Sequence, residues 1–235
     1  MIVERPSHQR GHGPAQVDWL DSRHTFSFGD YYDPQWMGFG VLRVINEDRV
    51  APGAGFPTHG HANMEILSYV LSGALAHEDS TGGGGVIRPG ELQWMSAGHG
   101  VRHSEFNGSQ DEPVHFLQIW LQPDRVNAAP AYAQRAAAGG EGWQLLASPD
   151  GRDDSLAIRQ DARVFNARLA ADAVAEYELQ DSRRYWLHVA QGEVEANDRV
   201  LQVGDALGLV EEAAALRVTG RGDSSADVLL FDLPL

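Results

Sequence analysis

The sequence predicts an all-β protein whose strands form a sandwich or a barrel. Short runs of β-forming residues alternate with turn residues at roughly regular spacing, which is typical of these folds. The 235 residues include 26 Gly and 11 Pro, scattered between those runs. Helical signal is scarce, and the best candidate is the Ala-rich segment 128–138, which follows Pro123 and ends at Gly139 and Gly140.

Six runs carry the clearest strand pattern, and they are spread over most of the chain. Val, Ile, Leu, Phe and Trp are frequent in them, and Gly, Pro, Asn or Asp residues stand close to their borders. The runs are residues 40–45, 64–71, 91–95, 114–121, 186–189 and 228–231.

The chain also repeats itself weakly, in the order strand, Gly turn, strand, loop, Gly–acid turn, strand. The first copy begins at 69–73 and the second at 187–192, which holds a single His and no His-X-His sequence. Chance similarity between β-hairpins is the alternative explanation. A Pro-, Ala- and Gly-rich stretch joins the two copies. We therefore expect an N-terminal domain over residues 1–122, a linker over 123–143 and a C-terminal domain over 144–235.

Composition and charge limit the classes of partner. A formal net charge of -15 disfavours direct binding to nucleic acid and to anionic membranes, because affinity for both comes from Lys and Arg. The chain has no cysteine, and its first 13 residues lack the apolar core of a signal peptide. No apolar run is long enough to span a bilayer. We expect a cytoplasmic protein.

Two short motifs place metal-capable side chains at alternate positions: His59 and His61, then His103 and Glu105. Alternate residues of a β-strand point to the same face. Two neighbouring strands would therefore aim three imidazoles and one carboxylate at one point. The pattern predicts a mononuclear metal site in the N-terminal domain. Surface histidines on hairpin edges are the alternative.

The chemistry of these side chains limits the metal and its role. Nitrogen and oxygen ligands suit Fe, Mn, Ni, Co, Zn or Cu, and no sulfur ligand from cysteine is possible. Four protein ligands would leave two positions of an octahedron open, as a catalytic metal needs.

Longer segments around these motifs resemble a known family. Residues 53–65 (GAGFPTHGHANME), followed by Gly73, resemble the first cupin motif. Residues 88–98 (RPGELQWMSAG) and 101–105 (VRHSE) resemble the second motif in the form found in pirins, and the N-terminal segment 19–28 (WLDSRHTFSF) is similar to the pirin opening. The resemblance runs from about residue 10 to 123 and continues more loosely to the C-terminus.

The resemblance implies a bicupin, with two β-barrel or jelly-roll domains packed together in one chain and metal only in the N-terminal barrel. Carried over by position, it implies that His59, His61, His103 and Glu105 are the metal ligands. In the general cupin pattern the acid that ends the first motif is a ligand. Here Glu65 lies one residue off that spacing, so we expect a structural or supporting role for it.

The closest resemblance is to bacterial pirin-like quercetin 2,3-dioxygenases. It implies a metal-dependent dioxygenase that cleaves a flavonol ring with O2 and releases CO, with Glu105 as the catalytic base. The expected cofactor is one divalent transition metal ion, with Fe(II) favoured and Zn, Ni, Co, Mn or Cu as alternatives. The other readings are a metal- or redox-sensing regulator that acts through a protein partner, and a bicupin enzyme that acts on another small molecule.

Several residues outside the ligand set were also candidates for the site. His24 and His99 lie in motif segments and are candidates to orient ligands. Aromatic and aliphatic side chains of the strand-like runs are candidate pocket walls: Phe39, Val41, Ile66, Trp94 and Phe116.

Overall fold

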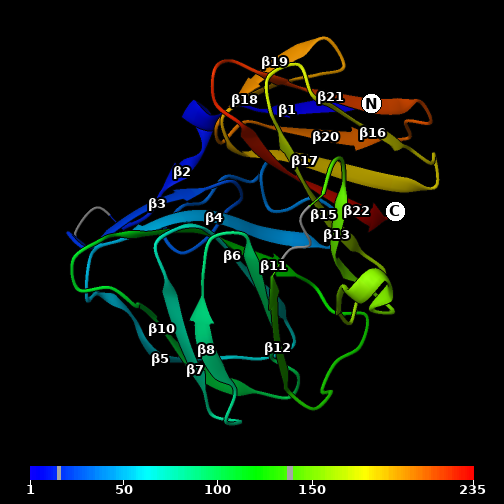
Figure 1. Ribbon diagram of the computed structural model, residues 1–235. Coiled ribbons are helices and arrows are strands. Elements are labelled where there is room, and N and C mark those ends of the chain that lie inside the picture. Colours follow the sequence, from blue (N-terminus) through cyan, green and yellow to red (C-terminus); the bar gives the residue numbers. More distant parts are fainter. Residues whose placement is uncertain (15–16, 137–139) are drawn as a thin grey trace. The chain divides into compact units, whose positions relative to one another are not determined.

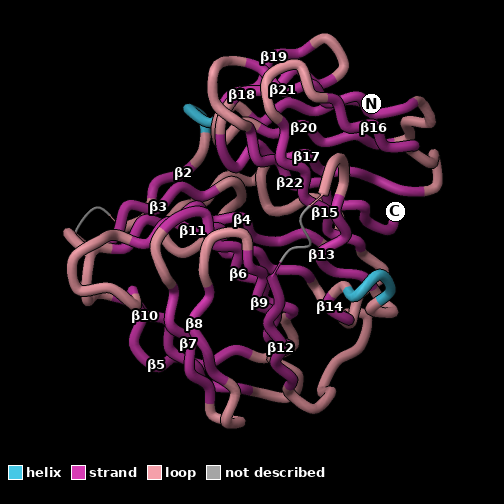
Figure 2. Tube along the Cα trace, in the orientation of Figure 1, coloured by secondary structure: helices cyan, strands magenta, loops and turns pink. Residues whose placement is uncertain are grey.

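The computed structural model describes residues 1–14, 17–136 and 140–235, and nearly all of its regular structure is β-strand (Figures 1 and 2). Two short 3-10 helices, η1 (Ser7–Gln9) and η2 (Arg152–Asp154), are the helical elements of this part of the chain. No helix among the described residues is long and apolar enough to cross a membrane. The fold is all-β, as expected from the sequence.

The chain divides into two compact units. The first unit comprises the described residues of Met1–Arg10, Ala138–Ala157 and Asp161–Leu235, and the second those of Gly11–Ala137 and Ile158–Gln160. The unit formed by Gly11–Ala137 carries both histidine motifs, so we call it the N-terminal barrel. We call the other unit the C-terminal barrel.

Two antiparallel sheets build the N-terminal barrel. The larger sheet has the strand order β12-β9-β6-β11-β4-β3-β2, and the smaller sheet has the order β5-β10-β7-β8. The strands of the larger sheet are β2 (Gly11–His12), β3 (Leu20–His24), β4 (Leu42–Val50), β6 (Glu65–Ser72), β9 (Glu91–Ser96), β11 (Val114–Leu121) and β12 (Ala131–Ala136). Those of the smaller sheet are β5 (Gly55–His61), β7 (Leu75–Asp79), β8 (Gly84–Ile87) and β10 (Val101–Asn107).

The C-terminal barrel repeats this plan with a seven-stranded sheet, β1-β20-β17-β22-β15-β13-β14, and a four-stranded sheet, β16-β21-β18-β19. The first sheet contains β1 (Ile2–Arg5), β13 (Gln144–Ser148), β14 (Leu156–Ala157), β15 (Arg163–Leu169), β17 (Arg183–Gln191), β20 (Ala206–Val210) and β22 (Ala226–Pro234). The second contains β16 (Val174–Glu178), β18 (Glu193–Ala196), β19 (Arg199–Gln202) and β21 (Ala215–Arg221).

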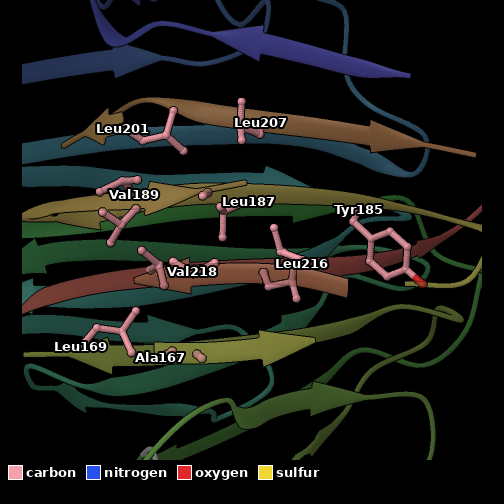
Figure 3. Close-up of a cluster of buried hydrophobic side chains, with 14 of the residues drawn as sticks. Ala167, Leu169, Tyr185, Leu187, Val189, Leu201, Leu207, Leu216 and Val218 are labelled. Carbon is pink, nitrogen blue, oxygen red and sulfur yellow. The ribbon is translucent and has the colours of Figure 1, made fainter. Parts of the chain in front are cut away.

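Apolar side chains from both sheets fill the C-terminal barrel. Leu187 and Leu207 of the larger sheet belong to the same buried cluster as Leu216 and Val218 of the smaller one (Figure 3). Each of these four side chains is excluded from solvent. Burial of this area is the main stabilising contribution to a β-sandwich. Polar and charged side chains also lie buried in both barrels, for example Glu105 in the N-terminal barrel and Asp232 in the C-terminal barrel.

The expected domain boundaries differ from the two units, and two of the differences involve whole strands. Residues Ile2–Arg5 form β1, which pairs with β20 of the C-terminal barrel, although the sequence analysis placed them in the first domain. Residues Ala131–Ala136, which lie in the expected linker, form β12 and pair with β9 of the N-terminal barrel. Both are edge strands whose partners are fixed by long-range pairing, which a local pattern does not reveal.

The expected helix over 128–138 is wrong for the described residues, and its last two positions lie outside them. Residues 131–136 are instead the edge strand β12. Helix propensity of Ala is a weak preference that tertiary pairing overrides. Here Tyr132 stacks on the ring of His77, and the Gln134 side chain donates to the Val86 carbonyl.

Candidate metal centre

The antiparallel pairing of β5 with β10 brings the two histidine motifs together. His103 lies directly opposite His59, and Val101 lies opposite His61. The register then shifts between His103 and Glu105, so that Glu105 pairs with Phe56. Pro57 sits at this irregularity, and proline has no N–H to donate to the ladder. The extra residue lies on β5, whereas β10 pairs with β7 without a shift, so His103 and Glu105 stay on the same face of β10.

The three imidazoles form one cluster. Ring centroids are 4.4 Å apart for His59 and His103, 4.7 Å for His59 and His61, and 4.9 Å for His61 and His103. One candidate ligand atom from each of the three lies within 4.8 Å of the others. The shortest approach is 3.1 Å, between Nε2 of His59 and Nε2 of His103.

The protonation of these rings favours a cation. Nδ1 of His59 lies 2.9 Å from the Pro57 carbonyl oxygen, which only accepts, so Nδ1 carries the proton and Nε2 has a free lone pair. Burial, reinforced by the neighbouring imidazoles, lowers the pKa of His103 to about 3 and that of His61 to about 4. Neutral imidazole is the form that binds a metal. The donor set therefore fits a divalent transition metal ion.

Glu105 is buried beside the histidines and is held by two donors. The Ser68 hydroxyl donates to its Oε1 at 3.0 Å, and the Gln118 amide donates to its Oε2 at 2.7 Å. Burial raises the pKa of Glu105 to about 7, and repulsion from Asp48 also raises it. The hydrogen bond from Ser68 acts in the opposite direction and lowers the pKa. A carboxyl group with a pKa near neutral is suited to exchanging a proton.

The grouping of ligand atoms differs from the expected set of four. Among the described residues, Glu105 belongs to a cluster with His77 and His103, whereas His59, His61 and His103 form the other. His103 is common to both clusters. The structure thus brings the three predicted histidines together and places Glu105 on the side of His103 that faces His77.

His77 is the main residue that the sequence analysis missed. It lies on β7 opposite Glu105, is buried, and stacks on Tyr132 with ring centroids 5.0 Å apart and an interplanar angle of 16°. Its Nδ1 is 3.4 Å from Nδ1 of His103, and its Nε2 is 3.4 Å from Oδ2 of Asp79. His77 and Asp79 repeat the alternate spacing of the two recognised motifs, which was the available signal.

A cavity of about 490 Å³ opens onto His59, His61 and Glu105. This volume falls within the range of small-molecule sites. Its polar lining includes Asp48 and Gln118, and its aromatic lining includes Phe28, Phe56 and Trp120. The Trp120 ring makes edge contacts with Phe28, at 5.3 Å between centroids, and with His61, at 4.9 Å.

The pocket walls expected from the sequence are not the ones observed. None of Phe39, Val41, Ile66, Trp94 and Phe116 lines the cavity. Ile66 and Phe116 belong to buried apolar clusters instead. Phe39 and Val41 precede β4 and are not in a strand. Ile66, Trp94 and Phe116 are in strands as expected, but alternate positions face opposite sides of a sheet, and the sequence did not reveal which side faces the cavity.

Glu65, His24 and His99, the remaining candidates for supporting roles, occupy different surroundings. Glu65 accepts hydrogen bonds from Nε1 of Trp94 at 2.7 Å and the Ser96 hydroxyl at 2.5 Å, and it is in neither ligand cluster. It therefore has the structural role expected of it. His24 is buried and lines the cavity, whereas His99 is exposed.

Two family models match the chain in succession. The model for Pirin matches residues 4–121, and the model for the quercetinase C-terminal cupin domain matches residues 145–233. The chain belongs to the pirin family. The matched segments follow the two barrels, and the first contains both histidine motifs.

Relatives of this pirin match it over its full length or nearly so. It is 45% identical over 234 residues to quercetin 2,3-dioxygenase of Escherichia coli K12, covering 100% of this chain and 99% of the relative. A pirin-like protein of Caulobacter vibrioides is 40% identical over 224 residues, which are 94% of this chain and 95% of the relative.

Solved structures agree with this assignment. The crystal structure of YhhW from E. coli superposes with a TM-score of 0.94 at 44% identity, covering 100% of this chain and 98% of that one. A structure of the bacterial pirin YhhW in complex with nickel(II) gives a TM-score of 0.92 at 44% identity, covering 100% and 99% of the two chains.

Proposed function

We propose that this pirin is a metal-dependent dioxygenase that opens the ring of a quercetin-type flavonol with O2 and releases CO. The observation that carries the proposal is the approach of two imidazole nitrogens, Nε2 of His59 and Nε2 of His103, to 3.1 Å beside a buried carboxyl group. Full-length relatives named quercetin 2,3-dioxygenase support the choice of reaction.

The proposed ligands are His59, His61, His103 and Glu105, around one divalent transition metal ion. Such an ion would act as a Lewis acid that favours the oxyanion of a bound flavonol. Nitrogen and oxygen donors accept several metals, and Fe(II) is the ion we favour. The nickel(II) complex of the E. coli pirin supports a divalent ion.

Glu105 is the proposed base for the flavonol 3-hydroxyl. It lines the cavity, and its pKa near 7 allows it to take a proton at neutral pH. The Ser68 and Gln118 donors hold both carboxylate oxygens, which fixes the direction of the group. Removal of the proton makes the substrate electron-rich, which the reaction with O2 requires.

The cavity walls suit a planar aromatic substrate. Phe28, Phe56 and Trp120 offer aromatic surface, and Asp48 and Gln118 offer polar groups for substrate hydroxyls. Apolar walls exclude water from the reacting atoms, and a fixed orientation brings the substrate close to the metal centre.

The direct test is O2 uptake and CO release by the purified protein with quercetin and each of several divalent metals. We expect turnover with at least one metal, and we expect Glu105→Gln to lose most of it while retaining metal. The control variant is Val126→Ala, at an exposed position that does not line the cavity; it should turn over quercetin like the wild type. Absence of turnover with every metal, or an unchanged rate in Glu105→Gln, would contradict the proposal.

A further inference from the structure

Asp79, His77 and His103 form a line of buried side chains that leads into the candidate metal centre. Oδ2 of Asp79 is 3.4 Å from Nε2 of His77, and Nδ1 of His77 is 3.4 Å from Nδ1 of His103. The side chains of His77 and Asp79 are 0% and 1% exposed. Water therefore does not compete for these contacts, and the protein alone decides where each ring carries its proton.

The Asp79 end of the line is fixed by three donors. Its Oδ1 accepts from the Thr81 amide at 2.7 Å, from the Thr81 hydroxyl at 2.6 Å and from the Gly83 amide at 3.1 Å. This leaves Oδ2 for His77. A carboxylate only accepts, so Nε2 of His77 carries the proton of that ring.

The proton position on His77 decides the proton position on His103. With its proton on Nε2, a neutral His77 presents the lone pair of Nδ1 to Nδ1 of His103 and to the Gln93 amide, which is 3.4 Å away. Nδ1 of His103 must then be the donor. The lone pair of His103 is left on Nε2, the atom that lies 3.1 Å from Nε2 of His59.

We propose that Asp79 and His77 are positioning residues that hold His103 in the tautomer with a free Nε2, and so prepare it to bind a divalent transition metal ion. The inference rests on the metal site of the proposed function. The near-parallel stacking of His77 on Tyr132 keeps the His77 ring in the plane that this chain of hydrogen bonds needs. Partners of this kind typically change metal affinity about 10- to 100-fold.

The variant Asp79→Asn tests the proposal sharply, because its amide has one allowed orientation. The three donors around Oδ1 require an oxygen at that position, so the amide NH2 faces His77. It would donate to Nε2 of His77, which moves the ring proton to Nδ1. His103 would then accept at Nδ1 and carry its own proton on Nε2, where it blocks the metal.

The experiment records long-range 1H–15N spectra of metal-free protein to assign the tautomers, and titrates the same samples with NiCl2 by calorimetry. In the wild-type protein we expect a protonated Nδ1 and an unprotonated Nε2 on His103. In Asp79→Asn we expect the reverse, with nickel affinity reduced at least tenfold. Thr81→Ala is the matched control, because it removes one donor from Oδ1 and leaves Oδ2 facing His77; its tautomers and affinity should match the wild type.

Two results would overturn the proposal: a wild-type spectrum with the proton on Nε2 of His103, or an Asp79→Asn variant with unchanged tautomers and affinity. The wild-type spectrum decides even if Asp79→Asn does not fold. Neither readout uses quercetin. A protein that shows the expected tautomers and nickel affinities but does not turn over quercetin therefore disproves the proposed activity and leaves the positioning role standing.

Discussion

His59 and His103 face each other from directly paired positions of β5 and β10, with their Nε2 atoms 3.1 Å apart. The Pro57 carbonyl fixes the proton of His59 on the far side of its ring. If His103 also presents a lone pair, the two nitrogens repel each other until a cation lies between them. The pairing of the two strands therefore favours binding of a metal ion between His59 and His103.

The first prediction concerns the histidine pair of β5. His59→Ala combined with His61→Ala should abolish stoichiometric metal binding and leave the fold intact, because neither side chain belongs to a buried apolar cluster. Metal analysis after dialysis and circular dichroism measure the two effects. His99→Ala removes an exposed histidine and should bind metal normally. One equivalent of metal in the double variant would show that the ligands lie elsewhere.

The second prediction concerns Asp48, whose carboxyl group is buried in the cavity beside Ser22. Burial raises the pKa of Asp48 to about 7, and repulsion from Glu47 and Asp21 also raises it. The hydrogen bond from Ser22 lowers the pKa and so opposes both effects. The folded state thus favours the neutral acid. Ionisation of Asp48 therefore destabilises the folded protein. This loss of stability is absent below about pH 4, grows as the pH rises towards 7, and is complete above that.

Asp48→Asn should therefore raise the free energy of unfolding of the metal-free protein at pH 8, by an amount on the order of 2–4 kcal/mol, and much less at pH 4. Denaturant unfolding at the two pH values measures the difference. Ser22→Ala, which removes the donor that opposes the raised pKa, should have the opposite effect at pH 8. Equal changes for Asp48→Asn at both pH values would mean that the carboxyl group ionises freely in the folded protein.

The third prediction concerns the aromatic wall. Phe28→Ala removes the edge contact with Trp120 and should weaken quercetin binding roughly tenfold, since apolar contacts of this size discriminate by that amount. Metal content should not change. Quenching of protein fluorescence by quercetin measures the affinity, with Val174→Ala of the C-terminal barrel as the control. An unaltered affinity would place the flavonol outside this cavity.

The fourth prediction concerns the core of the C-terminal barrel. Leu187→Ala should destabilise the protein by about 2–5 kcal/mol, because the buried leucine leaves a cavity in a close-packed cluster. Val200→Ala, at a position that is 53% exposed, should change stability by less than about 0.5 kcal/mol. Thermal unfolding followed by circular dichroism compares the two. Similar melting temperatures would mean that this cluster contributes little to stability.

The all-β fold and much of the site could be predicted because both depend on local spacing. Alternate residues share a face of a strand, so His59, His61 and His103 were identified before the pairing of β5 with β10 was known. The pairing of Glu105 with Phe56 depends on the bulge at Pro57, and the placement of β1 depends on pairing with β20, about two hundred residues away. His77 carried the same alternate spacing with Asp79, but it lies between the two segments that resemble the cupin motifs.

The most direct test of the metal centre is an anomalous difference map of crystals loaded with nickel(II). We expect one peak bound by imidazole nitrogens of His59, His61 and His103 and by a carboxylate oxygen of Glu105. A peak bound by His77 in place of Glu105, with that carboxylate still held by Ser68 and Gln118, would contradict the proposed ligand set and the role of Glu105 in it.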